Sequence, residues 1–367
     1  MKKICVCIGY KSDYTWVKSV LEAIQAHPEL ELQLCVNSVH GFIWYDDFLN
    51  SITEDGFKID YGIPSLVGTR TMTAMGQSIA LGIIQYQTAL YALRPDILLA
   101  IGDRFETLSP VIAAAFHNIP IAHIGGGERT GTIDESTRHA ISKYANLHFV
   151  ANMDASKRLV AMGEDPCTVF VTGSPVVDLL KRFKPKSHYD TGDYLLVMQH
   201  PVTTESRVAG QQIRETLEAI RRVGMRTYLW YPNIDGGASL MVRAIDEFLE
   251  ENDLDIKLFN HMDYGMYLGM LYYCACFITN SSSGIREAGY FGVPVINLGT
   301  RQQCRLRGKN VIDVPHDREK ITKATHWAIT QSRFEPEELY GDGNAGKRIA
   351  DILAITEIKN TQKCLTY

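Results

Sequence analysis

The sequence predicts an α/β fold made of two doubly wound halves, each built on a parallel sheet. Three observations lead to this prediction. Short apolar runs that end in glycine or polar residues alternate with amphipathic stretches along the chain, which is the pattern of alternating strands and helices. The runs are nearly continuous in valine, isoleucine and leucine, as suits strands covered on both faces. The pattern stops at residues 181–193 and then starts again.

The first half contains six apolar runs of strand length. They are KKICVCIG, LELQLCV, DILLAIG, IPIAHIG, NLHFVA and TVFVTGSP. We expect these runs to form the sheet of an N-terminal domain over residues 1–180. The segment KRFKPKSHYDTGD, residues 181–193, is polar and contains proline and glycine, so it is predicted to be a linker.

The second half repeats the pattern over residues 194–344. Its runs are YLLVMQHP, MRTYLWYPN, DIKLFNHM, CACFITNSSSG and VPVINLGT, with helical stretches between them at 210–223 and 238–250. One more helix is predicted at about 345–358. Doubly wound sheets bind ligands at the carboxyl ends of their strands, so a chain with two of them is expected to bind its ligand in the cleft between the halves.

Composition excludes several kinds of partner. The 367 residues are 46% apolar, which is enough for a sizeable core. Lysine and arginine number 37 against 42 acidic residues, and no basic stripe interleaved with aromatics occurs, so we expect no nucleic acid partner. The first apolar run is too short for a signal segment or a membrane span. We therefore expect no membrane association and a cytoplasmic protein.

Cysteine and histidine spacing does not favour a metal site. The chain has eight cysteines but no CxxC pair. The CxC pairs Cys5/Cys7 and Cys274/Cys276 lie in apolar runs and are interpreted as small buried hydrophobes in a reducing compartment. His123, His139 and His148 show no HxxxH or HExxH spacing, so structural roles are favoured over metal ligation.

The segment FITNSSSGIREAG is the clearest phosphate-binding candidate. A strand is predicted to end at Thr279 and a helix to begin after it, which would point free N–H groups at an anion. Ser281 and Ser282 would add hydroxyl donors, and Gly284 would let a ligand approach the backbone closely. The alternative, plain helix capping by serine, is equally consistent with the composition.

Further phosphate and ribose candidates flank this segment. Glu287 could accept hydrogen bonds from ribose hydroxyls or could be a surface charge that stabilises the helix dipole. Arg301, just after the next strand, is a plausible second phosphate contact. At the first turn of the chain, Lys11 could reach a phosphate or be solvated, and Asp13 is interpreted as the N-cap of the first helix.

The segment GGGERTGTIDESTRHA combines glycines and carboxylates directly after a predicted strand. Glu128 and Asp134 are separated by a loop and can converge on one pocket, and Asp103 at the end of a neighbouring strand could join them. Carboxylates that lie close together raise one another's pKa. The glycines would let the backbone pass close to a ligand.

Simpler interpretations of the same segment stay open. Asp134 could only cap its helix, Glu128 could pair with Arg129 or Lys143, and the glycines could only make a turn. His200 is different from the other histidines, because it lies at the end of a strand and faces the proposed cleft.

Taken together, these motifs resemble one enzyme family. The runs GDRFE, GGGERTGTIDESTRHAISK, HPVTTE, YPNIDGG, NSSSGIREAGYFGVPVINLGTRQ and YGDGNA occur in this order. In order and spacing they are similar to the hydrolysing UDP-N-acetylglucosamine 2-epimerases over nearly the whole length. The resemblance implies a GT-B-type fold of two Rossmann-like domains with the active site between them. It also implies a final segment, residues 345–367, that packs back on the N-terminal domain, and a homodimer or homotetramer.

The resemblance also implies a reaction and its residues. UDP leaves C1 of the sugar as the C2 proton is removed, and water then adds to the glycal to give N-acetylmannosamine, without a metal or a redox cofactor. Asp103, Glu128 and Asp134 would form the acid/base group, although the proton-abstracting carboxylate stays open, and His200 would stabilise the leaving diphosphate. The nucleotide would be held by the residues Lys11, Arg104, Asn233, Ser281, Ser282, Gly284, Glu287 and Arg301.

Two departures from the family and three rival functions remain. The family usually has arginine at the position of Lys11, and lysine cannot make a bidentate phosphate contact. Gly125 adds a third glycine before the usual GGE. The rivals are the same chemistry on a GDP-linked or diacetamido sugar nucleotide, a glycosyltransferase of the same fold, and a non-catalytic sensor of nucleotide sugars.

Overall fold

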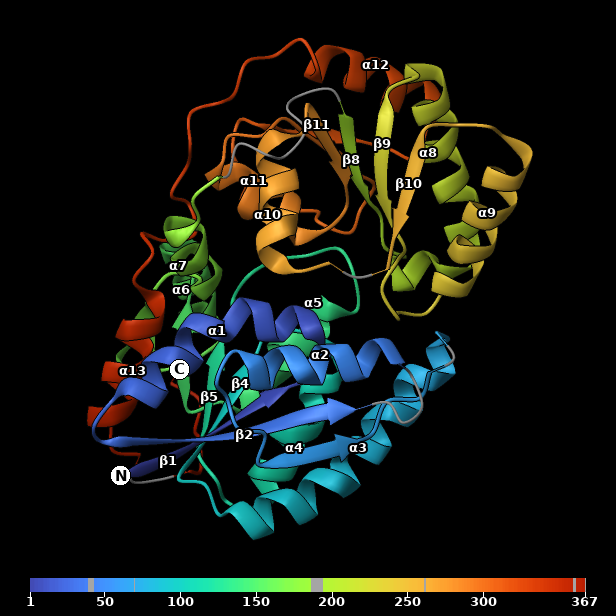
Figure 1. Cartoon of the computed structure of the whole chain (residues 1–367). Coiled ribbons are helices and arrows are strands. Elements are labelled where there is room, and N and C mark those ends of the chain that lie inside the picture. The colour runs from blue at the N-terminus through green and yellow to red at the C-terminus, as the bar shows by residue number, and fades with distance from the viewer. Residues whose placement is uncertain (39–42, 69, 186–193, 261, 359–360, 367) are drawn as a thin grey trace.

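The computed structural model describes residues 1–38, 43–68, 70–185, 194–260, 262–358 and 361–366. These residues form two sheets, one of seven strands and one of six, in which all paired strands are parallel (Figure 1). We call the part built on the seven-stranded sheet, β1 to α7, the first unit, and the part built on the six-stranded sheet, β8 to α12, the second unit. The predicted α/β class with two doubly wound halves is confirmed.

The first unit has the strand order β3-β2-β1-β4-β5-β6-β7. Its strands are β1 (Lys2–Ile8), β2 (Leu30–Ser38), β3 (Tyr61–Pro64), β4 (Ile97–Ile101), β5 (Ile121–Ile124), β6 (Leu147–Val150) and β7 (Val169–Val171). Its helices are α1 (Lys11–Ala26), α2 (Ile43–Glu54), α3 (Met72–Leu93), η1 (Phe105–Thr107), α4 (Leu108–Phe116), α5 (Asp134–Tyr144), α6 (Met153–Ala161), η2 (Pro166–Thr168) and α7 (Pro175–Arg182). The order reverses between β1 and β4, the point at which such sheets bind ligands.

The second unit has the strand order β10-β9-β8-β11-β12-β13. Its strands are β8 (Tyr194–Met198), β9 (Arg226–Trp230), β10 (Ile256–Phe259), β11 (Cys276–Thr279), β12 (Val295–Leu298) and β13 (Val311–Val314). Its helices are η3 (Thr203–Val208), α8 (Ala209–Val223), α9 (Ala238–Glu251), α10 (Tyr264–Tyr273), η4 (Ser282–Gly284), α11 (Glu287–Tyr290) and α12 (Arg318–Ala328), and α13 (Ala345–Ile355) follows.

Every predicted apolar run contains a strand, and two strands were missed. The missed strands, β3 and β13, are edge strands with half-exposed residues, so their sequences YGIP and VIDV lack the apolar run of a central strand. The prediction that Cys274 lies in a strand is wrong, because Cys274 is the C-cap of α10 and β11 begins at Cys276.

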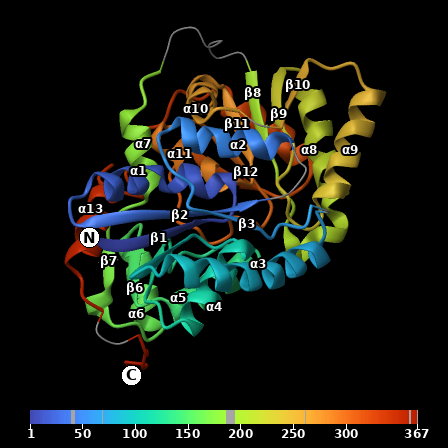
Figure 2. The same cartoon turned by 60° about the horizontal axis from the view of Figure 1, so that its bottom comes forward.

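Side chains on the two faces of each sheet belong to separate cores. In β1, Ile4 and Val6 pack in a cluster with residues of α1 and α13, whereas Cys5 and Cys7 belong to a cluster with residues of α3 and α4. Figure 2 shows α3 and α4 on the face of the first sheet opposite α1 and α2. Burial on both faces explains the continuous apolar runs.

The segments near the predicted linker and the last helix differ slightly from expectation. Helix α7 runs to Arg182, so residues 181 and 182 of the predicted linker are helical, and residues 186–193 lie outside the described residues. Helix α13 ends at Ile355 rather than near residue 358. It lies beside α1 (Figure 1), and Ile349 and Leu353 share the core cluster of α1. Within the described part of the chain, no helix has the length and apolar character needed to cross a bilayer.

Candidate functional site

The carboxyl ends of the two sheets meet where the units touch. The residues that follow the strands are Asp103 (β4), Glu128 and Asp134 (β5), His200 (β8), Asn233 (β9), Ser281 and Ser282 (β11) and Arg301 (β12). The Gly131 N–H donates to the Arg301 carbonyl at 3.1 Å, and the Ile133 N–H donates to Thr203 Oγ1 at 3.4 Å. A Cβ added to Gly131 would lie 1.9 Å from the Thr300 carbonyl oxygen. The loop after β5 is therefore docked tightly on the second unit.

The glycines of this loop serve the turn and its packing. Gly125 and Gly127 have φ angles of 87° and 74°, a backbone region that other residues rarely adopt. An added Cβ would lie 2.6 Å from the Trp16 ring at Gly125 and 2.2 Å from the Ala155 carbonyl at Gly127. The close neighbours are protein atoms, so the simpler interpretation, a turn, accounts for these glycines.

Glu128 is held by two arginines of the second unit. Nη2 of Arg286 donates to both carboxylate oxygens at 2.7 and 2.8 Å, and Nη2 of Arg305 lies 3.1 Å from Oε2. The alternative pairing of Glu128 with Arg129 or Lys143 is wrong, because Arg286 and Arg305 are its ion-pair partners. Burial raises the pKa of the Glu128 carboxyl, but the charges of Arg286 and Arg305 outweigh burial and leave that pKa below its usual value.

Asp103 joins the same charge cluster through another arginine. It accepts a hydrogen bond from Arg138, which is 1% exposed and also donates to the Glu128 carbonyl at 3.0 Å. Nη2 of Arg305 lies 3.8 Å from the Asp103 carboxylate. Burial opposes ionisation of Asp103, but the two guanidinium groups hold its pKa well below the usual range. Asp103 and Glu128 are therefore ionised at neutral pH.

Asp134 differs from these two carboxylates. It is the first residue of α5, and Ile133 is the N-cap, so the interpretation of Asp134 as a helix cap is wrong. Its nearest cation is Arg301, with Nη2 3.9 Å from Oδ2. Burial, and then the negative charge of Asp103, raise the pKa of Asp134 to about 6. The pKa values of Asp103 and Asp134 are thus pushed apart, as in pairs of groups with different acid/base roles.

His200 is fixed by hydrogen bonds on its backbone and its ring. The Asn280 side chain accepts from the His200 N–H at 2.7 Å and donates to the His200 carbonyl at 2.7 Å. The Asn233 N–H lies 3.2 Å from Nδ1 of His200, so Nδ1 is the acceptor and Nε2 carries the proton. Burial, and then the charge of Arg301, lower the pKa of His200 to about 3. The ring is a neutral hydrogen-bond donor.

Arg104 and Asp235 connect the two units beside His200. Arg104 donates to Glu106 at 2.8 and 3.1 Å, and its Nη2 lies 3.2 Å from Oδ1 of Asp235. The Arg104 guanidinium also lies 4.8 Å from the centre of the Tyr10 ring. Asp235 Oδ2 lies 3.8 Å from Nη2 of Arg301. The two arginines predicted to bind phosphate therefore share one carboxylate.

The NSSSG segment forms a tighter turn than expected. A 3₁₀ turn, η4, and a four-residue helix, α11, replace the predicted longer helix. Ser281 Oγ caps the turn by accepting from the Ser283 N–H at 3.3 Å, which supports the capping alternative for this serine. At Gly284 an added Cβ would lie 2.5 Å from Thr279 Cγ2. Packing on β11 therefore also requires glycine here, and the predicted approach of a ligand to this backbone stays a prediction.

Glu287 lies at the start of α11 and is not an isolated surface charge. The Tyr264 hydroxyl donates to Glu287 Oε1 at 3.4 Å, and burial raises the pKa of the Glu287 carboxyl. Hydrogen bonds from Ser283 and Tyr264 to the carboxylate act in the opposite direction and lower that pKa.

At the first turn, helix α1 begins at Lys11, so Asp13 is the third helical residue and Tyr10 is the N-cap. The Asp13 carboxylate accepts from the Tyr10 N–H at 2.9 Å, and burial raises the pKa of Asp13 to about 7. Lys11 crosses to the second unit, where Nζ donates to the Asn260 carbonyl at 3.2 Å. Burial there, and then the charge of Arg70, lower the pKa of Lys11 to about 8.

The histidines singled out in the sequence have structural partners. His123 Nε2 lies 2.7 Å from the Gly102 carbonyl. His148 and His139 each lie within 3.1 Å of a glutamate oxygen.

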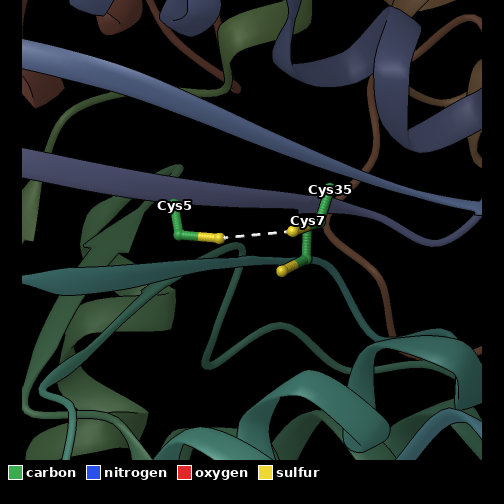
Figure 3. A group of neighbouring side chains, drawn as sticks. All are labelled: Cys5, Cys7 and Cys35. Atoms are coloured by element: carbon green, nitrogen blue, oxygen red, sulfur yellow. Dashed lines mark hydrogen bonds between the residues drawn. The ribbon is translucent and has the colours of Figure 1, made fainter. Parts of the chain in front are cut away.

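Three thiols come closest to the spacing of metal ligands. Cys5, Cys7 and Cys35 have Sγ atoms within 4.8 Å of one another, on β1 and β2 (Figure 3). Burial raises the pKa of the Cys7 thiol, whereas hydrogen bonds with Cys5 and Cys7 lower that of the Cys35 thiol to about 5. The three residues belong to an apolar core with Tyr86 and Leu90, in keeping with the interpretation of Cys5 and Cys7 as buried hydrophobes.

The sequence did not indicate the partners of the carboxylates. Arg138, Arg286, Arg305, Asp235 and Glu106 were missed. A weak signal existed for two of them, because Arg138 follows Asp134 by one helical turn and Asp235 lies two residues after Asn233.

Comparisons with known proteins agree on one family. The sequence profile of the UDP-N-acetylglucosamine 2-epimerase family matches residues 22–354. The UDP-N,N'-diacetylbacillosamine 2-epimerase (hydrolyzing) of Legionella pneumophila is 30% identical over 100% of both chains. The UDP-N-acetylglucosamine 2-epimerase of Neisseria meningitidis is 30% identical over 98% of this chain and 97% of its own.

A solved structure extends the comparison to the fold. The UDP-GlcNAc 2-epimerase from Neisseria meningitidis bound to UDP-GlcNAc superimposes with a TM-score of 0.80 at 18% identity, over 96% of this chain and 99% of that chain. At this identity the likeness shows the fold, and the GT-B-type arrangement is confirmed.

Proposed function

The chain belongs to the UDP-N-acetylglucosamine 2-epimerase family, and from this premise we propose that it is a hydrolysing enzyme that converts UDP-N-acetylglucosamine and water to N-acetylmannosamine and UDP. The observation that carries the proposal is geometric: the carboxylates Asp103, Glu128 and Asp134 of the first unit lie against arginines of the second unit where the two units meet. Asp134 has a pKa raised to about 6, whereas those of Asp103 and Glu128 are lowered. Elimination at C1 and C2 needs a group that exchanges a proton near neutral pH beside groups that stay charged.

In the first step, the C2 proton is removed and the C1–O bond breaks, so that UDP leaves with the electron pair and a glycal remains. Asp134 is the carboxylate best suited to exchange a proton, because its pKa lies nearest to neutrality. In the second step, water adds its hydroxyl group to C1 and a proton to C2 on the opposite face. Asp103 and Glu128, kept ionised by arginines, orient these groups and stabilise positive charge at C1.

The leaving diphosphate would be bound by donors from both units. Arg104 belongs to the first unit and Arg301 to the second, and both lie near Asp235. His200 would donate from Nε2 as a neutral ring. Lys11, Asn233, Ser281 and Ser282 would complete the phosphate contacts and Glu287 would accept from the ribose hydroxyls, whereas Gly284 shapes the turn that carries the serines.

Little space for a sugar nucleotide remains beside Glu128 where the units meet. The cavity beside Glu128, Asn152 and Arg305 has a volume of 10 Å³, which is at the lower limit for one water molecule. Gly131 is in contact with Thr300. We therefore place substrate binding in an open form and the chemistry in a closed form like the one described here, in which contact with bulk water is reduced but the water that the second step consumes can still reach the sugar.

A second candidate substrate is a diacetamido sugar nucleotide. It is favoured by the name of the Legionella relative, a UDP-N,N'-diacetylbacillosamine 2-epimerase, which matches over the full length. The elimination chemistry at C1 and C2 would be the same. The expected homodimer or homotetramer and the cytoplasmic location stay predictions.

Proton NMR of purified protein with UDP-N-acetylglucosamine in deuterated water tests the proposal. Free N-acetylmannosamine with deuterium at C2, released together with UDP, is the expected result, and Asp134→Asn should release neither. Turnover only of UDP-N,N'-diacetylbacillosamine would assign the second candidate. Turnover of any donor only after an acceptor sugar is added would contradict both and assign a glycosyltransferase.

A further inference from the structure

Asp235 lies between the two arginines that the proposed function assigns to the diphosphate. Its Oδ1 is 3.2 Å from Nη2 of Arg104 in the first unit, and its Oδ2 is 3.8 Å from Nη2 of Arg301 in the second unit. Each oxygen of this carboxylate therefore faces one arginine, as two oxygens of a phosphate would. Asp235 is 5% exposed, so water does little to screen these charges.

The carboxylate is held firmly in this place. Asn233 Nδ2 donates to Asp235 Oδ2 at 2.5 Å, and the Asp235 N–H donates back to Asn233 Oδ1 at 3.2 Å. The next residue, Gly236, packs on the first unit, with its N–H 3.2 Å from the sulfur of Met75. Asp235 thus occupies a fixed position on the contact surface between the units.

Arg301 retains a donor that Asp235 does not use. Its Nε is buried and has no hydrogen-bond partner among the residues that the structure describes. A buried guanidinium group without a full set of acceptors is costly, and a larger anion with several oxygens would satisfy it. Asp235 balances the charge of this site but fills only part of its hydrogen-bonding capacity.

We propose that Asp235 is an internal counter-anion that shares Arg104 and Arg301 with the bound diphosphate and, by repelling bound UDP, speeds release of this product. This inference rests on the proposed function. Substrate and product both carry a diphosphate, but removal of the sugar adds a second ionisable oxygen to the terminal phosphate. The repulsion from Asp235 is therefore stronger for UDP than for its sugar ester, and product is disfavoured relative to substrate.

The direction in which one substitution changes UDP affinity distinguishes this role from a positioning role. If Asp235 repels UDP, Asp235→Asn should bind UDP at least about tenfold more tightly, because a like charge within about 6 Å changes such equilibria by this factor or more. If Asp235 only positions Arg104, the same substitution should weaken UDP binding. Asparagine keeps the shape and can still contact Asn233.

The experiment is titration calorimetry of UDP into the full chain and three variants. Asp235→Asn is expected to tighten binding, and Asp235→Glu, which restores the charge, to return the affinity toward that of the original protein. Asp255→Asn, an exposed partner of Arg226, is the control for loss of one charge from the second unit and should leave the affinity unchanged. Product inhibition by UDP should strengthen in Asp235→Asn by the same factor as binding.

Unchanged or weaker UDP binding by a folded Asp235→Asn variant would overturn the inference, even if the protein epimerises UDP-N-acetylglucosamine. Inorganic pyrophosphate is the second probe, because it reports on the arginines without the nucleoside. If UDP fails to bind but pyrophosphate binds more tightly to Asp235→Asn, the proposed nucleotide is wrong and the counter-anion role holds. If neither probe binds to any variant, the arginines form no diphosphate site and the inference fails.

Discussion

Glu128 of the first unit and Arg286 of the second unit form a buried ion pair, with one guanidinium nitrogen 2.7 and 2.8 Å from the two carboxylate oxygens. The Arg286 guanidinium also lies over the rings of Trp16 and Tyr340, at 4.5 and 5.4 Å from their centres. A buried pair of this kind stabilises a closed arrangement only while both partners are present. The pair therefore links the charge state of a proposed catalytic carboxylate to the contact between the units.

Glu128→Gln is expected to lower kcat by about 10²–10⁴, the usual contribution of one acid/base group. UDP affinity should change by less than about threefold, because Glu128 faces the proposed sugar site rather than the diphosphate. Steady-state kinetics and calorimetry measure the two quantities. Glu215→Gln, at a partly exposed pair with Arg318, is the control, and equal turnover in both variants would remove Glu128 from catalysis.

Turnover should fall as the pH drops through about 6. The pKa of Asp134 is raised to about 6, and a base acts only when it is ionised. A pH profile of kcat measures this, and Asp134→Glu should shift its acidic limb, whereas Asp13→Asn should leave the position of the limb near 6. A flat profile between pH 5 and 8 would contradict the assignment.

Asp134→Asn is expected to make the fold more stable above pH 6 while it abolishes turnover. The folded pKa of about 6 lies above the ordinary value of 3.8, so between these values the folded state binds more protons than the unfolded state. Stability therefore falls as pH rises through this window. The gain in the variant should be on the order of 2 kcal/mol at pH 7.5 and near zero at pH 4, as measured by urea denaturation.

His200 should remain neutral from pH 5 to pH 8, with its proton on Nε2. Its pKa is lowered to about 3, and Nδ1 accepts from the Asn233 N–H. Nitrogen-15 NMR of the labelled ring reports both the tautomer and the charge. His200→Gln, which keeps a donor, should retain more activity than His200→Ala, and an imidazolium signal at pH 6 would show that the ring is an acid instead.

Ser282→Ala should weaken UDP binding, whereas Ser283→Ala should mainly lower stability. The Ser283 hydroxyl is buried against the Tyr267 hydroxyl at 2.5 Å, and loss of such a buried hydrogen bond typically costs about 1–3 kcal/mol. Calorimetry with UDP and thermal denaturation of both variants separate the two effects. Equal UDP affinity in Ser282→Ala and the original protein would remove Ser282 from the phosphate site.

The sequence alone predicted those features of the fold that depend on a single segment. Apolar runs predicted the central strands because burial on both faces demands them, and the polar residues after those runs lie at the expected edge of each sheet. It did not predict contacts between side chains of two segments that are distant in the sequence. Nothing near Glu128 in the sequence indicates Arg286 or Arg305, because arginines on amphipathic segments usually face water.

Glycines and caps depend on backbone detail that residue type alone does not determine. Gly284 and Gly127 fit the pattern of a ligand-binding loop, and in the structure an added Cβ would also meet protein atoms, those of Thr279 and Ala155. The sequence also allowed Asp134 to be the N-cap of α5, whereas in the structure Ile133 is the N-cap.

Gly131 determines how closely the two units can approach each other. Because the Thr300 carbonyl lies where a Cβ would be, even the methyl group of alanine would hold the two units apart by a distance comparable to its own radius. Under the proposed function, such a protein would still bind a nucleotide on its second unit, but the carboxylates would lie too far from the sugar to act on it. Affinity and catalysis would then be separable at a residue that carries no functional group at all.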